Sequence, residues 1–327
     1  MASPRLPAPP DGVDPQRWIS AQRARAAFDF QRSEVGRPET ERLTYRLQRP
    51  LAAVAKAAAR QWGTITSGRR ALPHFLVIGA KRAGSTTLFR GLVDGGGVAP
   101  MFPARENRKG VYYFDVHHHR GERWYRGHML RTACLDGQVV GEASPYYLSH
   151  PHAADRAAAL VPSARIVAVL RDPVARAHSH YNERCRQGVE YLPTFETAID
   201  AEERRLDGET ERMLADPSYV SWEHLNFGYL DQSRYAANLA RWYAAFPAEQ
   251  ILVVQAESLY ADPGAVLAEV RHFIGLEPVD LQRVTHHNKL TAEELDEAVH
   301  ARVAAALAPD TEQLDALIGR RFCWSDR

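Results

Sequence analysis

The chain of 327 residues has little of several features that would mark a particular class of protein. Its three cysteines (Cys134, Cys185 and Cys323) are far apart and form no Cys-x-x-Cys pair, which is typical of reduced thiols rather than a disulfide framework. The longest nearly apolar run, residues 51–59, contains Lys56 and is too short to cross a bilayer. Residues 1–12 lack the apolar segment of a signal peptide. We therefore expect a cytoplasmic protein.

Neither sign of charge is in excess. The formal net charge is +1, whereas a nucleic-acid-binding protein would show a basic stripe. The apolar fraction of 45% and the charged fraction of 25% are average for globular proteins. A chain of this length can bury a sizeable core in one large or two ordinary domains.

The most informative stretch is residues 74–88, HFLVIGAKRAGSTTL. Residues 75–78 predict a buried strand, and a helical pattern begins after Gly84. A strand, a glycine-bearing loop and a helix N-terminus together present backbone N–H groups to a phosphate. The spacing Gly79-x4-Gly84 matches a Walker A loop, but Ser85 stands where that motif has its lysine. The loop therefore suits a 5′-phosphate without the β/γ-phosphate partner of an ATPase.

Residues 1–72 form a distinct N-terminal extension. Its proline-rich start predicts disorder, and residues 18–30 and 43–62 predict helices. The second helix is alanine-rich and basic, which leaves two interpretations. It is either a solvated helix that packs on the domain, or an electrostatic dock for an anionic membrane or acceptor. We favour the first because the apolar face holds few large residues.

Residues 73–327 predict one α/β domain in which short apolar strands alternate with helices. Such strands indicate a central parallel sheet with helices on both faces, whose ligands bind beyond the carboxyl ends of the strands. The expected strands are residues 75–78, 139–141, 166–170 and 251–255. The expected helices are residues 85–93, 151–160, 173–187, 195–206, 233–246, 263–274, 292–307 and 311–318.

A second candidate phosphate site follows the strand at residues 166–170. Arg171 ends this strand, Asp172 can cap the next helix, and Pro173 suits the first helical turn. Ser179 lies about two turns further, on the face of the helix start. Arg171 and Ser179 could therefore bind one further phosphate. The alternative is that Arg171 merely pairs with an acid at the sheet edge.

The two sites together, in this order, resemble those of sulfotransferases that use 3′-phosphoadenosine 5′-phosphosulfate (PAPS), in particular the heparan sulfate sulfotransferase branch and its bacterial relatives. The resemblance covers about residues 73–327. It rests on residues 75–88, 166–181 (IVAVLRDPVARAHSHY) and 141–148 (GEASPYYL), and on the later segments 234–275 and 308–324. It implies the P-loop-like sulfotransferase fold.

The resemblance also implies roles for individual residues. In the family a loop lysine binds the bridging oxygen between phosphate and sulfate. That position is Arg82 here, which keeps the positive charge, and the preceding Lys81 can take the role if the loop is rotated. The implied cofactor-binding residues are Lys81, Arg82, Ala83, Gly84, Ser85, Thr86, Thr87, Arg171, Ser179 and Lys289.

The general base is less clear. Relatives carry a glutamate in the segment that corresponds to residues 109–115 (KGVYYFD), where this chain has Gly110. Nearby carboxylates that could accept a hydroxyl proton are Asp115, Glu106 and Glu142. We favour Asp115 and Glu142 as catalytic groups, together with Arg82 and Lys81. An ion pair with a site arginine is the alternative for Glu142.

Two further clusters carry less weight. The run His117–His119 does not predict a metal site, since consecutive histidines point in different directions, and the resemblance implies no metal. Aromatic residues could line the acceptor site, although half or more should belong to the core. They are Tyr112, Tyr113, Trp124, Tyr146 and Tyr147.

The sequence thus predicts a cytoplasmic, bacterial, PAPS-dependent sulfotransferase. It would transfer a sulfuryl group to a hydroxyl of a carbohydrate, glycolipid or other metabolite and release adenosine 3′,5′-bisphosphate. We expect no nucleic-acid partner and no transmembrane segment, while peripheral membrane contact stays open. The rival interpretations are a P-loop nucleotide kinase or NTPase, and a non-catalytic module that binds adenosine bisphosphate.

Overall fold

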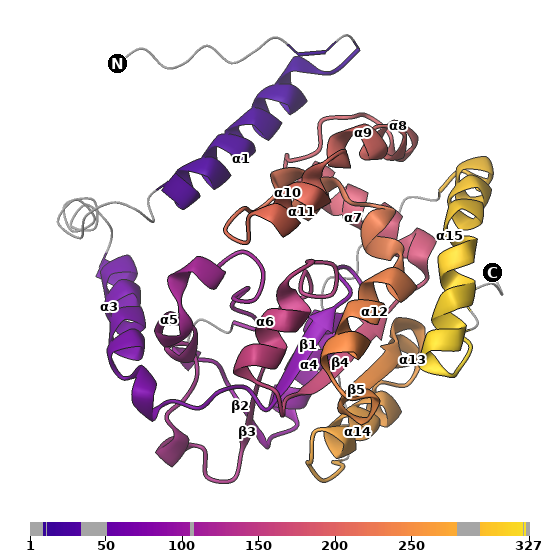
Figure 1. Ribbon diagram of the computed structural model, residues 1–327. Helices are drawn as coiled ribbons and strands as arrows, with labels where there is room; N and C mark the ends of the chain where they lie inside the picture. The colour runs from indigo at the N-terminus through magenta and orange to yellow at the C-terminus, as the bar shows by residue number, and fades with distance from the viewer. Residues whose placement is uncertain are drawn as a thin grey trace.

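In the computed structural model the described residues are 9–10, 12–33, 51–104, 108–279, 295–322 and 324. In this part of the chain, strands form one parallel sheet with the order β2-β3-β1-β4-β5 (Figure 1). The strands are β1 Phe75–Gly79, β2 Val98–Ala99, β3 Val139–Ala143, β4 Arg165–Leu170 and β5 Ile251–Gln255. The predicted central parallel sheet is confirmed, and β2 is an addition to the predicted strands.

Helices cover both faces of the sheet. The connection from β1 to β2 runs in one direction across the sheet, and those from β3 to β4 and β4 to β5 run in the other. Right-handed crossovers therefore place α4 on one face and α6 and α12 on the opposite face. The helices are α1 Pro15–Ser33, α3 Leu51–Ile65, α4 Ser85–Asp94, α5 Glu122–Arg126, α6 Ala153–Leu160, α7 Pro173–Arg186, α8 Phe195–Asp200, α9 Glu202–Leu206, α10 Glu209–Ala215, α11 Trp222–Phe227, α12 Tyr235–Ala245, α13 Ala256–Ala261, α14 Pro263–Phe273 and α15 Glu297–Ile318.

The predicted break between two C-terminal helices is wrong. Helix α15 continues through Pro309, where the sequence suggested an interruption. Leu307 and Leu314 lie on one face of the helix and are both buried, so tertiary packing holds the two halves in line. Asp310 adds a second anchor, because its carboxylate accepts hydrogen bonds from the N–H groups of Ala236 and Ala237 at the start of α12.

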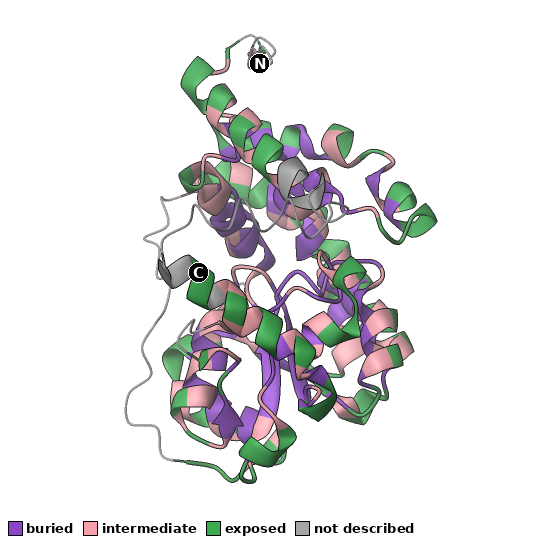
Figure 2. Cartoon of the chain, turned by 90° about the vertical axis from the view of Figure 1, so that its left-hand side faces the viewer, coloured by how far each residue is buried: buried purple, intermediate pink, exposed green. Residues whose placement is uncertain are grey.

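The core lies in and around the sheet. Figure 2 shows the strands in the colour of buried residues, and every residue of β1 is buried. In β4 the residues after Arg165 are buried as well. These two central strands read as continuous apolar runs because both of their faces are covered.

A second apolar cluster lies in the helical layer formed by α7, α8 and α11. It includes Phe195, Trp222 and Tyr229. Helix α1 packs on this layer, where the rings of Phe28 and Trp222 lie 5.0 Å apart between centroids. Thus α1 contacts the predicted domain, and the predicted domain boundary at residue 72 stays a prediction.

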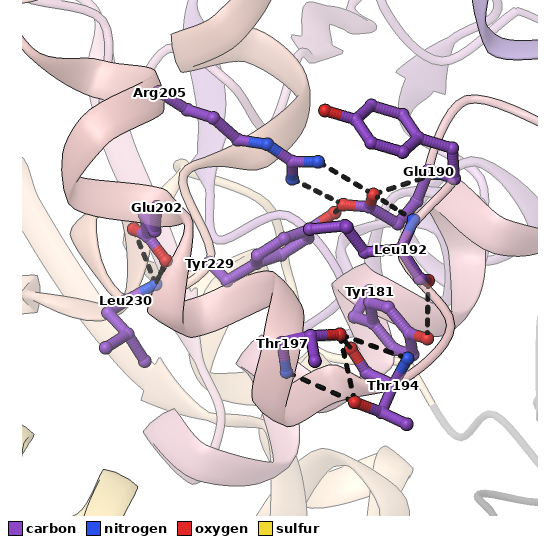
Figure 3. A network of polar contacts seen from close by, with 10 residues as sticks. Tyr181, Glu190, Leu192, Thr194, Thr197, Glu202, Arg205, Tyr229 and Leu230 are labelled. Carbon is purple, nitrogen blue, oxygen red and sulfur yellow. Dashed lines mark hydrogen bonds and ion pairs between the residues drawn. The ribbon is translucent and has the colours of Figure 1, made fainter. Parts of the chain in front are cut away.

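A buried carboxylate holds the helical layer together (Figure 3). Glu190 accepts two hydrogen bonds from the Arg205 guanidinium, at 2.7 and 3.0 Å, and one from the Tyr229 hydroxyl at 2.6 Å. Glu202 accepts hydrogen bonds from the N–H groups of Leu230 and Asp231. Glu190 therefore anchors the Tyr229 side chain, and Glu202 fixes the backbone of residues 230 and 231.

We predict that Glu190→Gln destabilises the protein by about 3–5 kcal/mol, because the change leaves the buried Arg205 guanidinium without its counter-charge. Glu196→Gln is the matched control, since Glu196 lies 3.7 Å from Arg302 in an exposed ion pair and should change stability by less than about 1 kcal/mol. Denaturant unfolding measures both effects. Equal stabilities of the two variants would contradict the role of Glu190.

Candidate active site

The predicted phosphate loop lies between β1 and α4. Gly84 caps α4 with a φ of 98°, and a Cβ on Gly84 would lie 2.8 Å from the Tyr260 hydroxyl. This position therefore needs glycine. Ser85, Thr86 and Thr87 form the first turn of α4, where backbone N–H groups lack helical acceptors and favour an anion.

The side chain of Arg82 connects this loop to α7. Arg82 has a φ of 72°, which is uncommon for a residue other than glycine. Its Nε donates a hydrogen bond of 3.2 Å to the Ser179 hydroxyl, and its guanidinium lies 2.8 Å from a carboxylate oxygen of Glu183. Burial lowers the pKa of Arg82, while the charge of Glu183 raises it. The structure thus brings two predicted phosphate-binding residues, Arg82 and Ser179, into direct contact.

The second predicted phosphate site lies at the adjacent strand end. The Asp172 carboxylate accepts a hydrogen bond of 2.7 Å from the Ala175 N–H, which confirms Asp172 as the cap of α7. Arg171 precedes this cap and forms no ion pair with any residue that the structure describes. Burial raises the pKa of Tyr260, and the positive charge of Arg171 opposes this rise. The charge of Arg171 also adds to the lowering of the Arg82 pKa by burial, so the three side chains surround one region.

Lys81 points away from Arg82, toward α11. Its Nζ donates a hydrogen bond of 2.6 Å to the Leu225 carbonyl oxygen and lies 5.7 Å from the ring centroid of Tyr146. Burial lowers the pKa of Lys81 well below its usual value, and the nearby positive charge of Arg184 adds to the shift. The two consecutive cations of the loop, Lys81 and Arg82, therefore face different sides of the site.

Lys109 is a third cation at the loop, and sequence reasoning missed it. Its Nζ donates a hydrogen bond of 3.1 Å to the Ser85 hydroxyl at the start of α4. Burial, followed by the charges of Arg82 and Arg90, lowers the pKa of Lys109 to about 8. The available signal was that Lys109 begins KGVYYFD, the same segment in which we expected the general base.

The carboxylate of Glu142 is fully enclosed. Its Oε1 accepts hydrogen bonds from the hydroxyls of Tyr125 and Tyr147, at 2.7 and 2.8 Å. Its Oε2 accepts from the Val111 N–H and the Ser144 hydroxyl, each at 2.8 Å. Burial raises the pKa of Glu142 against the effect of these bonds. Since four donors bond to its carboxylate and the side chain has no exposed surface, Glu142 is better suited to a structural role than to proton transfer.

Asp115 is different because one of its oxygens is free within the described part of the chain. Oδ1 accepts a hydrogen bond of 2.5 Å from the Val116 N–H, whereas Oδ2 is buried without a partner there. Burial raises the pKa of Asp115 to about 8, and the charge of Glu142 adds to this effect. The charge of Asp115 also acts on Lys81 and Tyr146, which places the three side chains near one another.

The backbone excludes a side chain at residue 110. A Cβ on Gly110 would lie 2.3 Å from the Ala143 carbonyl oxygen and 2.6 Å from the Ser144 hydroxyl. The Lys109 carbonyl accepts a hydrogen bond of 2.5 Å from the Ala143 N–H, which holds the two segments together. The glutamate that the resemblance implies at this position therefore has no equivalent in this structure.

One protein family matches most of the chain. The sequence model of the sulfotransferase domain family matches residues 72–298, which is more than half of the chain. The chain belongs to the sulfotransferase family. The predicted family and the predicted P-loop-like fold are thereby confirmed.

Three relatives illustrate the similarity. Human heparan sulfate glucosamine 3-O-sulfotransferase 3B1 is 32% identical over 68% of this chain and 51% of its own length. The membrane-associated sulfotransferase kil1 of Dictyostelium discoideum is 25% identical over 78% of this chain and 67% of its own length. The crystal structure of a sulfotransferase from Alicyclobacillus acidocaldarius matches with 25% identity and a TM-score of 0.61, over 77% of this chain and 98% of that one. The chain thus spans about half the length of the human relative.

Three polar side chains, buried Tyr146, buried His224 and half-buried Asp231, support the candidate site from the α11 side. The Tyr146 hydroxyl lies 2.7 Å from Nδ1 of His224, and Nε2 of His224 lies 3.2 Å from the Asp231 carboxylate. Leu225, which holds Lys81, follows His224 directly. This network therefore fixes the turn of α11 against which the Lys81 ammonium rests.

The other predicted site residues are two that the structure does not describe and five aromatic residues. Lys289 and Glu106 lie outside the described residues. Of the five aromatic residues, Tyr112, Tyr146 and Tyr147 all lie within the electrostatic reach of Asp115, and the Tyr147 hydroxyl is in addition bonded to Glu142. Tyr113 stacks on Tyr125 with a centroid distance of 4.4 Å. Tyr113 and Tyr147 thus belong to the core.

Two kinds of feature are absent from the described residues. No helix among them is both long and apolar enough to span a bilayer. No group of three or more histidine, cysteine or acidic side chains among them is arranged to hold a metal ion.

We predict that Gly110→Glu lowers stability and leaves no gain in turnover, because the new Cβ would overlap the Ala143 carbonyl. Gly68→Ala is the control, since a Cβ on Gly68 meets no atom within 4 Å. Thermal unfolding should show a large loss of Tm for the first variant and little change for the second. A stable Gly110→Glu variant with raised turnover would contradict the proposed exclusion.

Proposed function

We propose that this chain transfers a sulfuryl group from PAPS to a hydroxyl of a carbohydrate, glycolipid or other metabolite and releases adenosine 3′,5′-bisphosphate. The observation that carries the proposal is the contact between Arg82 of the phosphate loop and Ser179 of α7. This contact joins two anion-binding elements at neighbouring strand ends. An ATPase would instead need a lysine after Gly84, where this chain has Ser85.

The residues fit a ligand with phosphate at both ends. The first turn of α4, Ser85 and Lys109 would bind the 5′-phosphosulfate, and Arg171 and Ser179 would bind the 3′-phosphate. Arg82, which lies between these groups, would stabilise the charge that develops on the departing phosphate. PAPS supplies the activated sulfuryl group when it is bound.

Asp115 is the base that the geometry favours. Its unpartnered Oδ2 can accept the proton of the acceptor hydroxyl as the acceptor oxygen bonds to sulfur and the bond from sulfur to the 5′-phosphate oxygen breaks. Lys81 lies close enough to Asp115 for its charge to favour the carboxylate form. We assign Glu142 a structural role beside the site, since its carboxylate already accepts four hydrogen bonds.

We extend the proposal to a glycan acceptor, because the human relative is named as a heparan sulfate glucosamine 3-O-sulfotransferase. A cytoplasmic, bacterial origin stays part of the proposal. The exposed free thiol of Cys134 suits a reducing compartment.

Transfer of ³⁵S from labelled PAPS into an extract of the native cell tests the proposed reaction. We expect labelled acceptor and a matching amount of adenosine 3′,5′-bisphosphate. Binding of the bisphosphate without any transfer would leave a non-catalytic module, and preference for ATP would contradict the proposal.

We predict that Arg82→Ala lowers kcat by about 10²–10³-fold while it weakens binding of the bisphosphate product much less, because its charge acts mainly in the transition state. Lys81→Ala is the matched comparison at the neighbouring position, and its effect should be smaller. The opposite ranking of the two variants would assign the leaving-phosphate role to Lys81.

We predict that kcat/KM rises with pH through an apparent pKa of about 8, because Asp115 must lose its proton before it can act as a base. Asp115→Asn should lower kcat by about 10²-fold and abolish the rise. Glu142→Gln is the comparison, and it should lower stability while the residual activity keeps the rise. A pH profile that Asp115→Asn leaves unchanged would exclude Asp115 as the base.

A further inference from the structure

Three large apolar side chains of helix α3 face away from the protein. Val54, Trp62 and Ile65 are exposed by 41%, 53% and 62%. With about 100° per residue, these three positions and Ala58 fall within an arc of about 80° on the helix. Gly63 lies on the opposite side and is buried. An ordinary surface helix would instead bury its large apolar residues against the protein.

The inner face of α3 is built for close approach. A Cβ on Gly63 would lie 2.3 Å from the carbonyl oxygen of Gly127, so the backbones of α3 and α5 pack without intervening side chains. Beyond the end of α3, Arg70 donates hydrogen bonds to the Thr66 hydroxyl at 2.8 Å and to the Met129 carbonyl at 2.5 Å. The exposed stripe, which comprises Val54, Ala58, Trp62 and Ile65, is therefore held in place by contacts of other residues.

The segment that carries the stripe has positive charges and no negative ones. Residues 51–93 contain no aspartate or glutamate, although acidic residues are almost as numerous as basic ones in the whole chain. The guanidinium of Arg131 lies 5.9 Å from the ring centroid of Trp62, and Arg69 is exposed just beyond the helix. An apolar stripe with a basic rim complements a surface that is apolar below a layer of negative charge.

We propose that the Trp62 surface, which comprises Val54, Trp62, Ile65, Arg69 and Arg131, docks on a bilayer that contains anionic phospholipid. Exposed tryptophan and isoleucine would enter the region between head groups and acyl chains, and the arginines would contact lipid phosphates. A protein groove could cover the apolar stripe as well, but the lack of any acidic residue in residues 51–93 favours a uniformly anionic partner. The sequence favoured a solvated helix that packs on the domain, because its apolar face holds few large residues. Their outward placement favours the membrane alternative instead.

Co-sedimentation of the full chain with vesicles tests this surface. Vesicles of phosphatidylcholine with phosphatidylglycerol should carry the protein into the pellet, and vesicles of phosphatidylcholine alone should carry much less. An increase of NaCl from about 0.1 M to about 0.5 M should weaken the binding, because salt screens the arginines. The double variant Trp62→Ser/Ile65→Ser should lower the partition coefficient by about tenfold or more.

Leu214→Ser is the matched control, since Leu214 is exposed by 54% on α10 and should keep full binding. Affinity for adenosine 3′,5′-bisphosphate should be the same in both variants and shows that each is folded. Absence of binding to anionic vesicles, or equal binding by the double variant, would overturn the proposal. Self-association that the double variant abolishes, without vesicle binding, would make the surface an interface between two copies and overturn it too.

Discussion

The site depends on positive charge that the fold removes from water with few internal counter-charges. Burial lowers the pKa values of Lys81, Arg82 and Lys109, and within the described part of the chain Glu183 alone forms an ion pair with one of them. Such desolvated and mutually repelling cations are unfavourable in the absence of an anion. A ligand with several negative charges offsets this cost by replacing lost hydration. The rest of the structure can be understood as the means of holding these groups in place.

Two parts of the fold supply that support. The order of the sheet puts the carboxyl ends of β1 and β4 side by side, so the loop before α4 and the cap of α7 meet. The helical layer supplies the other side. Glu202 fixes the backbone at Asp231, which holds His224, and the adjacent Leu225 carbonyl receives Lys81. Charged groups in the helical layer thus support the Leu225 carbonyl that receives Lys81.

The sequence predicted those features whose cause is local. Strands β1 and β4 are continuous apolar runs, and Asp172 before a proline is a helix cap by its own chemistry. Features that depend on distant partners were missed. Lys109 reaches Ser85 across 24 positions, and α11 is short and held mainly by its contacts. Glu142 and Asp115 have the same chemistry in sequence, and the structure separates them because tyrosines 125 and 147 enclose Glu142.

The central claim is a site for two phosphates, and calorimetric titration tests it most directly. Adenosine 3′,5′-bisphosphate and adenosine 5′-monophosphate differ in one phosphate, which we assign to Arg171 and Ser179. The account predicts that the bisphosphate binds about 10–100-fold more tightly, as expected for charge-assisted hydrogen bonds, and that Arg171→Ala removes most of this difference. Equal affinity of the two nucleotides for the unmodified protein, or a preference that Arg171→Ala leaves unchanged, would contradict it.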